Sequence, residues 1–352
     1  MPKTEPGTLH FIHPGSIGQA SGGTIYDRGV IERLRDMGWQ VTLHELPGRF
    51  PLSDADTRAA ASRLLAAIPD RALVVVDGLA LPAFEGALAK HADRLSFTGL
   101  IHHPTADETG LSAAESEGLF AIEQRLFGLL RRFIVPSPAM ARRLGDFGVA
   151  AARIRVVPPG VEPAQRSVGS SGGAVQLLCV ASLTPRKGHL ALLEALADCR
   201  DLAWRLVCAG PPDEGGETEA QVKAALVRLG LADRVRLVGP QRGQALESLY
   251  AAADAFVLAS RYEGYGMVFG EAMAHGLPIV ASGAGAVADT VPDAAGIVVP
   301  VGDHDALVAA LRHMIGDPAY RRGKAEGAWQ VGRPLPRWAD TAAAFARALS
   351  KP

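Results

Sequence analysis

Two glutamates that stand eight residues apart, Glu263 and Glu271, lie in a stretch whose neighbouring residues predict an anion site. The apolar residues 255–258 have the length of a buried strand, and a polar turn that contains Glu263 follows them. A helix is expected from about Met267, and Gly276 is placed to end it. The N-terminus of such a helix carries unpaired amides and a partial positive charge, which suit a phosphate or a leaving oxyanion. The turn before the helix consists of Gly264, Tyr265 and Gly266.

The second carboxylate, that of Glu271, falls about one turn inside the expected helix. It serves a ligand only if it accepts hydrogen bonds, for instance from a pair of ligand hydroxyls. Two glutamates near a helix start are more often solvated, or partners of the helix dipole, and the spacing alone leaves that interpretation open. The two glycines and the aromatic residue between strand and helix favour a ligand site.

Two adjacent cations, Arg186 and Lys187, occur in the loop between an expected strand at 175–180 and the helix that follows it. Exposed surface charge is the alternative interpretation. Ligands of parallel sheets bind at the carboxyl ends of the strands, and two cations there would neutralise a diphosphate. Because these cations and a helix N-terminus would neutralise the negative charge of a diphosphate, neither a metal nor another cofactor is expected.

The loop after the first expected strand carries Gly22 and Gly23, followed by a helix expected at 24–37. Their amides would point to where a diphosphate could lie, and a plain tight turn is the alternative. This loop is not the dinucleotide-binding fingerprint, because only Gly15 and Gly18 match its glycine spacing and no acidic residue ends the second strand. A nicotinamide cofactor is therefore not expected.

Two adjacent histidines, His102 and His103, come at the end of an expected strand at 96–102. A histidine at the carboxyl end of a strand is well placed to face a ligand, but one of two neighbours must point away. We choose His102 as the ligand-facing residue.

Alternating strand-like and helix-like segments must position these residues. The expected strands are short apolar runs bounded by glycine, proline or polar turns, at 9–13, 40–44, 72–77, 96–102, 133–136, 154–157, 175–180, 204–209, 235–238, 255–258, 278–281 and 296–299. The alternation predicts an α/β protein with two Rossmann-like, doubly wound domains. We place the first domain at 1–165 and the second at 174–335, with a linker at 163–173 and a final helix at 338–350 that packs back on the first domain.

The composition excludes several classes of protein. The chain has 352 residues, of which 48% are hydrophobic, so two packed cores are expected. A net charge of −1 indicates no basic surface for nucleic acid. The three cysteines are too few and too separated in sequence for a disulfide framework or a zinc site, and Asp54 and Asp56 are interpreted as residues of a helix start rather than metal ligands. No leader and no membrane-spanning stretch is evident, so a cytoplasmic location is expected.

The helical stretch 113–132 leaves two interpretations open. Its apolar residues fall on one side, which is typical of a helix that packs on a core. Arginines on the other side suggest, as the alternative, peripheral contact with the inner membrane face and a lipid acceptor.

The segment EGYGMVFGEAMAHGLPIV, which begins at Glu263, resembles the E-x7-E signature of the retaining glycosyltransferases of family four. The resemblance is strong from about residue 176 to 303 and weaker in the amino-terminal half. It implies the GT-B architecture, in which two Rossmann-like domains face across a cleft and the carboxy-terminal domain holds a nucleotide-sugar.

The resemblance also implies roles for single residues. Glu271 would hold the ribose hydroxyls, Glu263 the sugar, Lys187 a phosphate, and His102 the donor sugar. Ser182 stands where many members have a phosphate-binding arginine, so Arg186 would take over that charge. Further donor-binding residues are expected in the loops that follow strands, at Gly22, Gly23, Val238, Gly239, Pro240, Gly264, Tyr265, Gly266, Met267 and Val268.

The expected function is the transfer of a hexosyl group, with retention, from a UDP- or GDP-type nucleotide-sugar to an acceptor hydroxyl on a lipid or a small glycoside. A nucleotide-sugar epimerase or hydrolase, and a non-catalytic sugar-nucleotide binding protein, are the alternatives on the same architecture.

Overall fold

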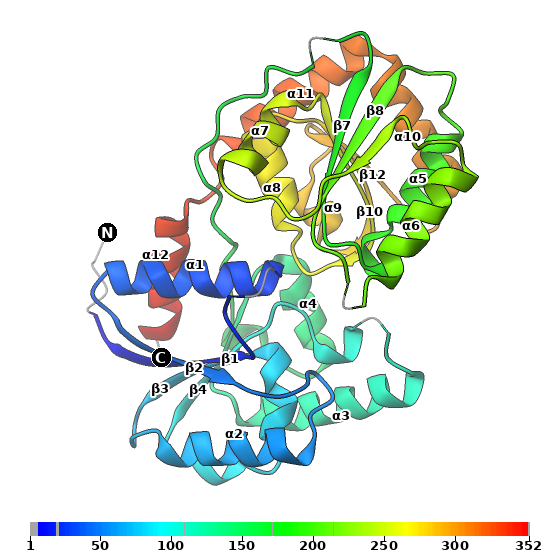
Figure 1. Ribbon diagram of the computed structural model, residues 1–352. Helices are drawn as coiled ribbons and strands as arrows, with labels where there is room; N and C mark the ends of the chain where they lie inside the picture. The colour runs from blue at the N-terminus through cyan, green and yellow to red at the C-terminus, as the bar shows by residue number, and fades with distance from the viewer. Residues whose placement is uncertain (1–5, 19–20, 109, 171, 214, 351–352) are drawn as a thin grey trace. The chain divides into compact units, whose positions relative to one another are not determined.

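The computed structural model describes residues 6–18, 21–108, 110–170, 172–213 and 215–350. The chain forms two compact units, of which the first comprises the chain up to Gly160 and again from Pro336, and the second is Val161–Leu335. Each unit contains a six-stranded parallel sheet between layers of helices (Figure 1). The predicted pair of doubly wound α/β domains is therefore confirmed.

The sheet of the first unit has the strand order β2-β1-β3-β4-β5-β6, with parallel pairing throughout. Its strands are β1 (Thr8–Pro14), β2 (Gln40–Leu46), β3 (Leu73–Asp77), β4 (Ser96–Leu100), β5 (Arg132–Val135) and β6 (Ile154–Val156). Its helices are α1 (Gly22–Asp36), α2 (Ala55–Ala67), α3 (Ala113–Leu129), α4 (Pro138–Asp146) and α12 (Trp338–Ser350), with 3-10 turns η1 (Gly78–Phe84), η2 (Leu88–His91), η3 (Thr105–Asp107) and η4 (Ala151–Arg153). Because the chain turns to opposite sides after β1 and after β3, the carboxyl ends of these neighbours form a switch point, where ligands of such sheets bind.

Side-chain caps fix where the helices of the first unit begin. Ser21 accepts a hydrogen bond from the helix backbone and caps α1. Asp54 does the same for α2, as the sequence predicts. Ser112 and Glu115 form a reciprocal capping box at the start of α3. Each cap satisfies amides that would otherwise lack a partner at the helix N-terminus.

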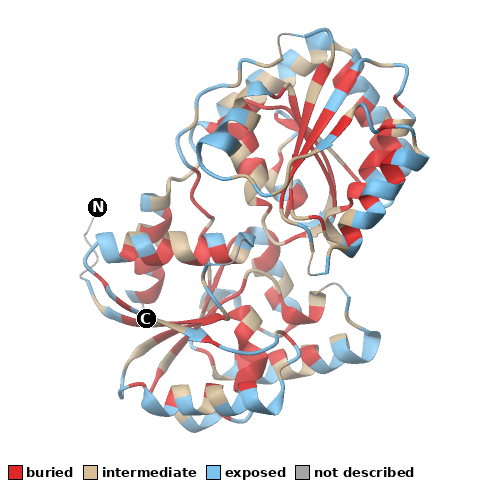
Figure 2. Cartoon of the chain, in the orientation of Figure 1, coloured by how far each residue is buried: buried red, intermediate tan, exposed pale blue. Residues whose placement is uncertain are grey.

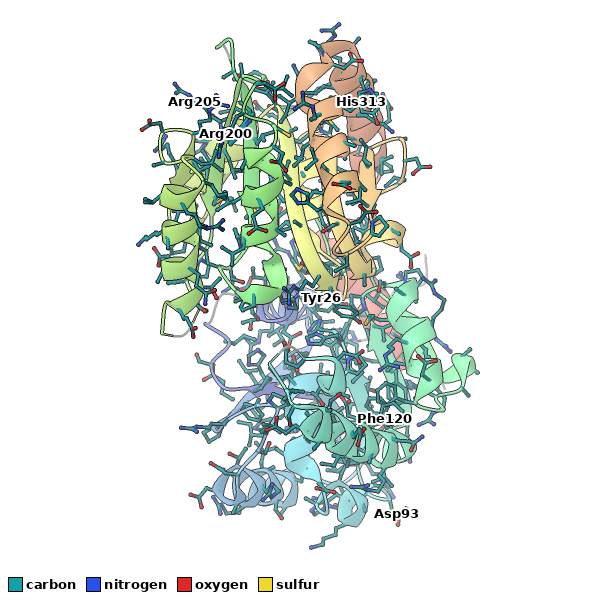
Figure 3. All side chains as sticks on the ribbon, turned by 90° about the vertical axis from the view of Figure 1, so that its right-hand side faces the viewer. Tyr26, Asp93, Phe120, Arg200, Arg205 and His313 are labelled. Carbon is teal, nitrogen blue, oxygen red and sulfur yellow. The ribbon has the colours of Figure 1, made fainter. Side chains whose placement is uncertain are left out.

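The last helix, α12, packs on α1 within the first unit. Tyr26 of α1, labelled in Figure 3, lies edge-on to Trp338 of α12 with 6.2 Å between ring centroids. Its hydroxyl donates to the Val157 carbonyl at 2.9 Å, and Thr341 of α12 donates to the Pro158 carbonyl at 3.0 Å. The chain thus returns to the first unit after it has built the second.

The sheet of the second unit has the order β12-β11-β10-β7-β8-β9, again with parallel pairing. Its strands are β7 (Val175–Val180), β8 (Trp204–Ala209), β9 (Val235–Leu237), β10 (Ala255–Glu263), β11 (Ile279–Gly285) and β12 (Gly296–Val299). Its helices are α5 (His189–Ala197), α6 (Glu217–Arg228), α7 (Gln244–Ala252), α8 (Met267–Ala274), α9 (Val287–Thr290), α10 (His304–Gly316) and α11 (Pro318–Gly332), with the 3-10 turn η5 (Pro185–Lys187). Here β7 and β10 flank the switch point.

Buried residues are concentrated on the strands and on the sheet-facing sides of the helices, and exposed residues on the outer faces (Figure 2). Strands such as β7, β10 and β11 carry nearly continuous apolar runs because helices cover both faces of a parallel sheet. The cores hold the sheets rigid, so the loops at the carboxyl ends of the strands keep defined positions.

Two segments differ from the expectations. Strand β10 does not end near residue 258 but continues to Glu263, because after a bulge Tyr262 still pairs with Ala284 and Glu263 with Gly285 of β11. The stretch at 163–173 was expected to be a linker, yet its Ser167 hydroxyl donates to backbone carbonyls of the second unit, and its Ser170 hydroxyl donates to a carboxylate there. These hydroxyls tie a turn-rich segment down, and the units divide at Gly160 instead.

The apolar side of helix α3 packs in the first unit. Leu119, Leu126 and Phe127 are at most 3% exposed, and Phe120, labelled in Figure 3, lies tilted against Phe147 with 4.4 Å between ring centroids. This side is thus part of the core of the first unit, as the first interpretation predicts. Among the described residues, no helix is long and apolar enough to cross a membrane.

Candidate functional site

The first candidate site lies at the switch point of the second unit. Strands β7 and β10 are direct neighbours, with Ala255 opposite Leu177 and Phe256 opposite Leu178. Lys187 ends the turn η5 that follows β7, and Glu263 is the last residue of β10. The parallel sheet therefore brings two residues that are 76 positions apart in sequence to the same edge.

Gly188 determines how closely the turn after β7 approaches β10. Its φ of +66° lies in the left-handed region, and a Cβ at this position would stand 1.9 Å from the Ala259 carbonyl oxygen. Only glycine fits both constraints. The close approach is what allows the side chain of the preceding residue, Lys187, to reach Glu263.

Glu263 is held by three side chains. Its Oε1 accepts hydrogen bonds from Lys187 Nζ and from the Ser260 hydroxyl, both at 2.6 Å. Arg186 Nη1 lies 3.5 Å from Oε2 and also donates to the Tyr262 carbonyl at 2.9 Å. The structure thus brings together Arg186, Lys187 and Glu263, which the sequence places in two separate motifs.

The electrostatics of this group keep Glu263 ionised. Burial acts to raise its pKa, but the cations of Lys187 and Arg186 outweigh burial, and the net pKa lies below its usual value. The side chain of Glu263 is 6% exposed, whereas those of Lys187 and Arg186 are 15% and 26% exposed. The carboxylate is therefore covered, and both cations keep a face that an anionic ligand can reach.

The turn after β10 leads into α8, which begins at Met267, as the sequence predicts. The residue before it, Gly266, offers no side chain to cap the helix. In the same turn, Gly264 and Tyr265 are half-buried, as is Val268 in the first turn of α8. An uncapped helix N-terminus beside two cations favours a negatively charged group.

Glu271 occupies the middle of α8 and is half-buried. Its Oε2 accepts a hydrogen bond of 2.7 Å from the hydroxyl of Tyr250, which comes from α7 and stacks on His275 at 4.8 Å. Burial raises the pKa of Glu271, although the bond from Tyr250 acts in the opposite direction. Tyr250 therefore orients one oxygen of the Glu271 carboxylate.

The remaining residues predicted in the second unit lie at the same carboxyl edge. Ser182 follows β7, on the same loop as Arg186 and Lys187, and is half-buried. Val238, Gly239 and Pro240 follow β9, the edge strand, where Val238 donates to the Cys208 carbonyl and the Gly239 carbonyl accepts from Gly210. Strand β9 is separated from β7 by β8, and none of these residues contacts the Lys187–Glu263 pair through a described hydrogen bond.

A second candidate site lies in the first unit, around His102. This residue follows β4, which ends at Leu100 rather than at 102. His102 Nε2 lies 2.8 Å from Asp27 Oδ1 and 3.6 Å from Asp77 Oδ2, whereas His103 turns to Glu108 at 2.9 Å. The two neighbouring histidines therefore point to different partners.

Gly22 and Gly23 do not precede α1 but form its first turn, because Ser21 caps the helix two residues earlier than expected. A Cβ on Gly23 would stand 3.1 Å from His102 Cδ2, so the missing side chain lets helix and imidazole approach. For Gly22, no side chain of the described residues lies within 4 Å of the Cβ position. Gly23 thus adjoins His102, and Gly22 does not.

Sequence reasoning missed the carboxylates behind His102 and the hydroxyls behind the two glutamates. Asp77 ends β3 and His13 is the last residue but one of β1, the two strands of the switch point, and that position was the available signal for both. Nothing in the sequence marks Asp27, which reaches the same place from α1. Ser260 and Tyr250 likewise lie in segments whose pattern indicates only a strand and a helix.

The cysteines are closer in space than their spacing suggests. Cys179 of β7 and Cys208 of β8 are register partners, and Cys179 Sγ lies 3.8 Å from His189 Nε2 of α5. All three side chains are buried, and the cysteines are free thiols. Adjacent strands thus bring together two of the three cysteines, which are far apart in sequence.

Sequence models of two families match the chain. "Glycosyltransferase Family 4" matches residues 21–165, and "Glycosyl transferases group 1" matches residues 161–328. The chain is also similar to D-inositol 3-phosphate glycosyltransferase of Geodermatophilus obscurus, with 34% identity over 212 residues that make up 55% of this chain and 47% of the relative. The chain spans about half the length of the curated relatives it matches.

Among solved structures, sucrose-phosphate synthase from Thermosynechococcus elongatus has the same fold, with a TM-score of 0.82 and 22% identity over 97% of each chain. HepE of Anabaena, solved in complex with UDP and glucose, gives a TM-score of 0.73 and 18% identity over 97% of this chain and 99% of that chain. The two family models together cover almost the whole chain between residues 21 and 328, and this protein belongs to the family 4 glycosyltransferases of the GT-B fold.

Proposed function

We propose that this protein transfers a hexosyl group from a UDP- or GDP-type nucleotide-sugar to an acceptor hydroxyl, with retention at the anomeric carbon. The observation that carries the proposal is the arrangement of Lys187, Arg186 and Glu263 beside the N-terminus of α8 at the β7/β10 switch point. Cations and helix amides suit a diphosphate, and a covered carboxylate suits positive charge that develops on a sugar. The complex of HepE with UDP and glucose supports the choice of donor.

In the proposed reaction the bond between the anomeric carbon and the diphosphate oxygen breaks, and the acceptor hydroxyl attacks from the same face. Its proton passes to a phosphate oxygen of the departing nucleoside diphosphate, so no separate general base is needed. Lys187, Arg186 and the amides after Gly266 would stabilise the negative charge, each such donor contributing about 3 kcal/mol by analogy with oxyanion holes. Glu263 would offset the positive charge on the sugar.

The donor contacts are assigned by the same logic. Glu271, oriented by Tyr250, would accept hydrogen bonds from the ribose hydroxyls through its remaining oxygen. The loop at Val238–Pro240 would lie against the base. Arg186 would supply the charge that Ser182 lacks. In the first unit, His102 would contact a hydroxyl of the sugar substrate. We infer that no divalent metal takes part, because Lys187 and Arg186 already neutralise the negative charge of the diphosphate.

A donor panel tests the proposal. Thermal unfolding in the presence of UDP- and GDP-sugars identifies the donor, because a ligand at 100 times its Kd stabilises by about 2.7 kcal/mol. Incubation of that donor with inositol phosphates, sugar phosphates, small glycosides and lipid extracts, followed by mass spectrometry, should show a glycosylated product. Proton NMR of its anomeric coupling then reports retention or inversion.

Three other outcomes would contradict the proposal. Free sugar as the sole product would indicate a hydrolase, and an epimerised nucleotide-sugar would indicate an epimerase. Binding without turnover across all acceptors would indicate a sugar-nucleotide sensor. Glu263→Gln is the control for trace contaminants, since a true activity of this site should fall with that change.

A further inference from the structure

Four side chains converge behind the ligand-facing surface of the first unit, at the β1/β3 switch point. His13 lies at the carboxyl end of β1, one residue before its last, and Asp77 ends β3. Asp27 comes from α1, and His102 follows β4. Asp27 is fully buried, and His13 and Asp77 are 2% and 3% exposed, whereas the His102 side chain is 18% exposed. Only His102 thus reaches the surface from this group, which we call the β1/β3 network.

The contacts within the β1/β3 network fix the roles of its atoms. His13 Nδ1 lies 3.1 Å from the Gly15 carbonyl, which can only accept, so this nitrogen carries a proton. The other ring nitrogen, Nε2, lies 3.9 Å from Asp27 Oδ2, an oxygen that has no hydrogen-bond partner among the described residues. Asp77 Oδ1 accepts from the Leu79 amide at 2.7 Å.

His102 receives its orientation from the same carboxylates. Its Nε2 is 2.8 Å from Asp27 Oδ1 and 3.6 Å from Asp77 Oδ2, and the Cδ2 edge of the ring lies against Gly23. A neutral imidazole whose Nε2–H donates to a carboxylate has its lone pair on Nδ1. That nitrogen then accepts a hydrogen bond and does not donate one.

We propose that Asp27 and Asp77, together with His13, are positioning residues that keep the proton of His102 on Nε2 and leave Nδ1 to accept a hydrogen bond from a hydroxyl of the sugar substrate. The role of the hydroxyl rests on the proposed transferase function. The tautomer and the orientation of the ring are properties of the folded unit and do not depend on it.

The charges of the network agree with this arrangement. Burial lowers the pKa of His102, partly opposed by Asp77, so the ring is neutral at pH 7. Burial raises the pKa of Asp27 and of Asp77 to about 7 each. The titratable groups that face Asp27 are His13, Asp77 and His102, and the charge of His103 also acts on His102. When Asp27 takes up a proton on Oδ1, that oxygen becomes a donor to His102 Nε2, and the tautomer of His102 reverses. The orientation is therefore lost on the acid side of neutrality.

Hydrogen bonding describes these distances better than a shared metal ion. Ligand atoms about 2.0–2.1 Å from a tetrahedral zinc ion are about 3.4 Å apart, whereas His102 Nε2 and Asp27 Oδ1 are 2.8 Å apart, the length of a hydrogen bond. Although His13, Asp27 and Asp77 offer ligand atoms within 4.8 Å of one another, we therefore assign a proton to the contact with His102.

Nitrogen-15 NMR of the histidine rings tests the tautomer without any substrate. His102→Gln assigns the His102 signals, and we expect a neutral Nε2–H ring at pH 8 that changes tautomer or gains a proton as the pH falls below about 7. An Nδ1–H tautomer at pH 8, or a tautomer that is constant from pH 5 to 8, would overturn the proposal. Metal analysis of the same sample must show less than stoichiometric metal, since a bound ion would also overturn it.

Asp27→Leu and Asp27→Asn test the consequence for turnover. We expect Asp27→Leu to lower kcat by up to about a hundredfold, the effect of a misplaced substrate contact, while the affinity for nucleoside diphosphate changes less than twofold. Asp27→Asn keeps an acceptor oxygen and should retain more activity with a flatter acid limb of the pH profile. Glu123→Gln is the matched control, because Glu123 is also fully buried in this unit, burial raises its pKa to about 7, and it contacts no member of the network. A pH profile of activity that is unchanged in both Asp27 variants, or flattened equally in Glu123→Gln, would contradict the proposal. If the parent protein shows the expected His102 tautomer but no turnover, only the proposed function would be refuted.

Discussion

Removal of the Lys187 ammonium should destabilise the second unit far more than removal of an exposed lysine in an equally short ion pair. Lys187 Nζ lies 2.6 Å from Glu263 Oε1, with side-chain exposures of 15% and 6%. On α6 of the same unit, Lys223 Nζ lies 2.7 Å from Glu219, with exposures of 63% and 30%. The two pairs have nearly the same length and differ chiefly in burial, so Lys223→Met is the matched control for Lys187→Met.

The expected magnitudes follow from burial. Breaking a buried pair by removing one partner typically costs 3–5 kcal/mol, because the remaining charge stays buried. Arg186 at 3.5 Å and the Ser260 hydroxyl continue to serve Glu263, so we expect about 3 kcal/mol for Lys187→Met. An exposed pair of the Lys223 kind contributes about 0.3–0.5 kcal/mol. For a unit of this size, these losses correspond to a lower Tm by about 6–12 °C and about 1–2 °C.

Differential scanning calorimetry at pH 7 measures both variants and separates transitions of the two units. The double change Lys187→Met with Glu263→Gln should cost about 2 kcal/mol less than the sum of the single changes, since it leaves no unpaired charge. The pKa of Glu263 is lowered in the folded protein, so the pair stabilises fully above the usual pKa of 4.5 and is lost as the pH falls through the lower folded value. If Lys187→Met melted within 2 °C of Lys223→Met, the buried pair would not be a major contributor and the reasoning would fail.

Three further predictions concern the two candidate sites. Tyr250→Phe should weaken binding of the nucleoside diphosphate by about tenfold and leave kcat nearly unchanged, because it removes the hydrogen bond that orients Glu271, whose proposed contact with the donor is the same in the ground state and the transition state. A calorimetric affinity and a kcat that both fell would contradict this prediction. Asp27→Asn should raise Tm at pH 8, where Asp27 of the parent is ionised in the folded and the unfolded protein and burial of the charge costs up to about 4 kcal/mol. At pH 3 Asp27 is protonated in both the folded and the unfolded protein and no gain is expected, so an equal gain in Tm at both pH values would refute a role of the raised pKa. Excess chelator should leave most of the activity, and a loss restored only by magnesium or manganese would refute the proposed metal independence.

The family and the fold follow from features of the sequence that are local. Strands β7, β8 and β12 lie at the predicted residues, because short apolar runs bounded by turn residues leave little choice of where a buried parallel strand begins. The start of α8 at Met267 and the cap of α2 by Asp54 were also predicted, since both depend on residues within one helical turn. The motif that begins at Glu263 identified the family for the same reason.

Only the tertiary structure decided which residues meet. The approach of Lys187 to Glu263 depends on the neighbouring positions of β7 and β10 and on a glycine that fits against Ala259, neither of which a pattern along the chain can show. The full length of β10 depended on its pairing with β11 beyond a bulge.

The carboxylates behind His102 illustrate the same limit. Asp27 lies in a helix whose periodicity is that of any surface helix, and its burial results from packing of α1 over the ends of β1 and β3. Periodicity along a sequence reports which face of an element is apolar, because neighbours on that face share one partner surface. It cannot report which polar residues from different elements converge, because that depends on strand order and on the direction in which each loop leaves the sheet.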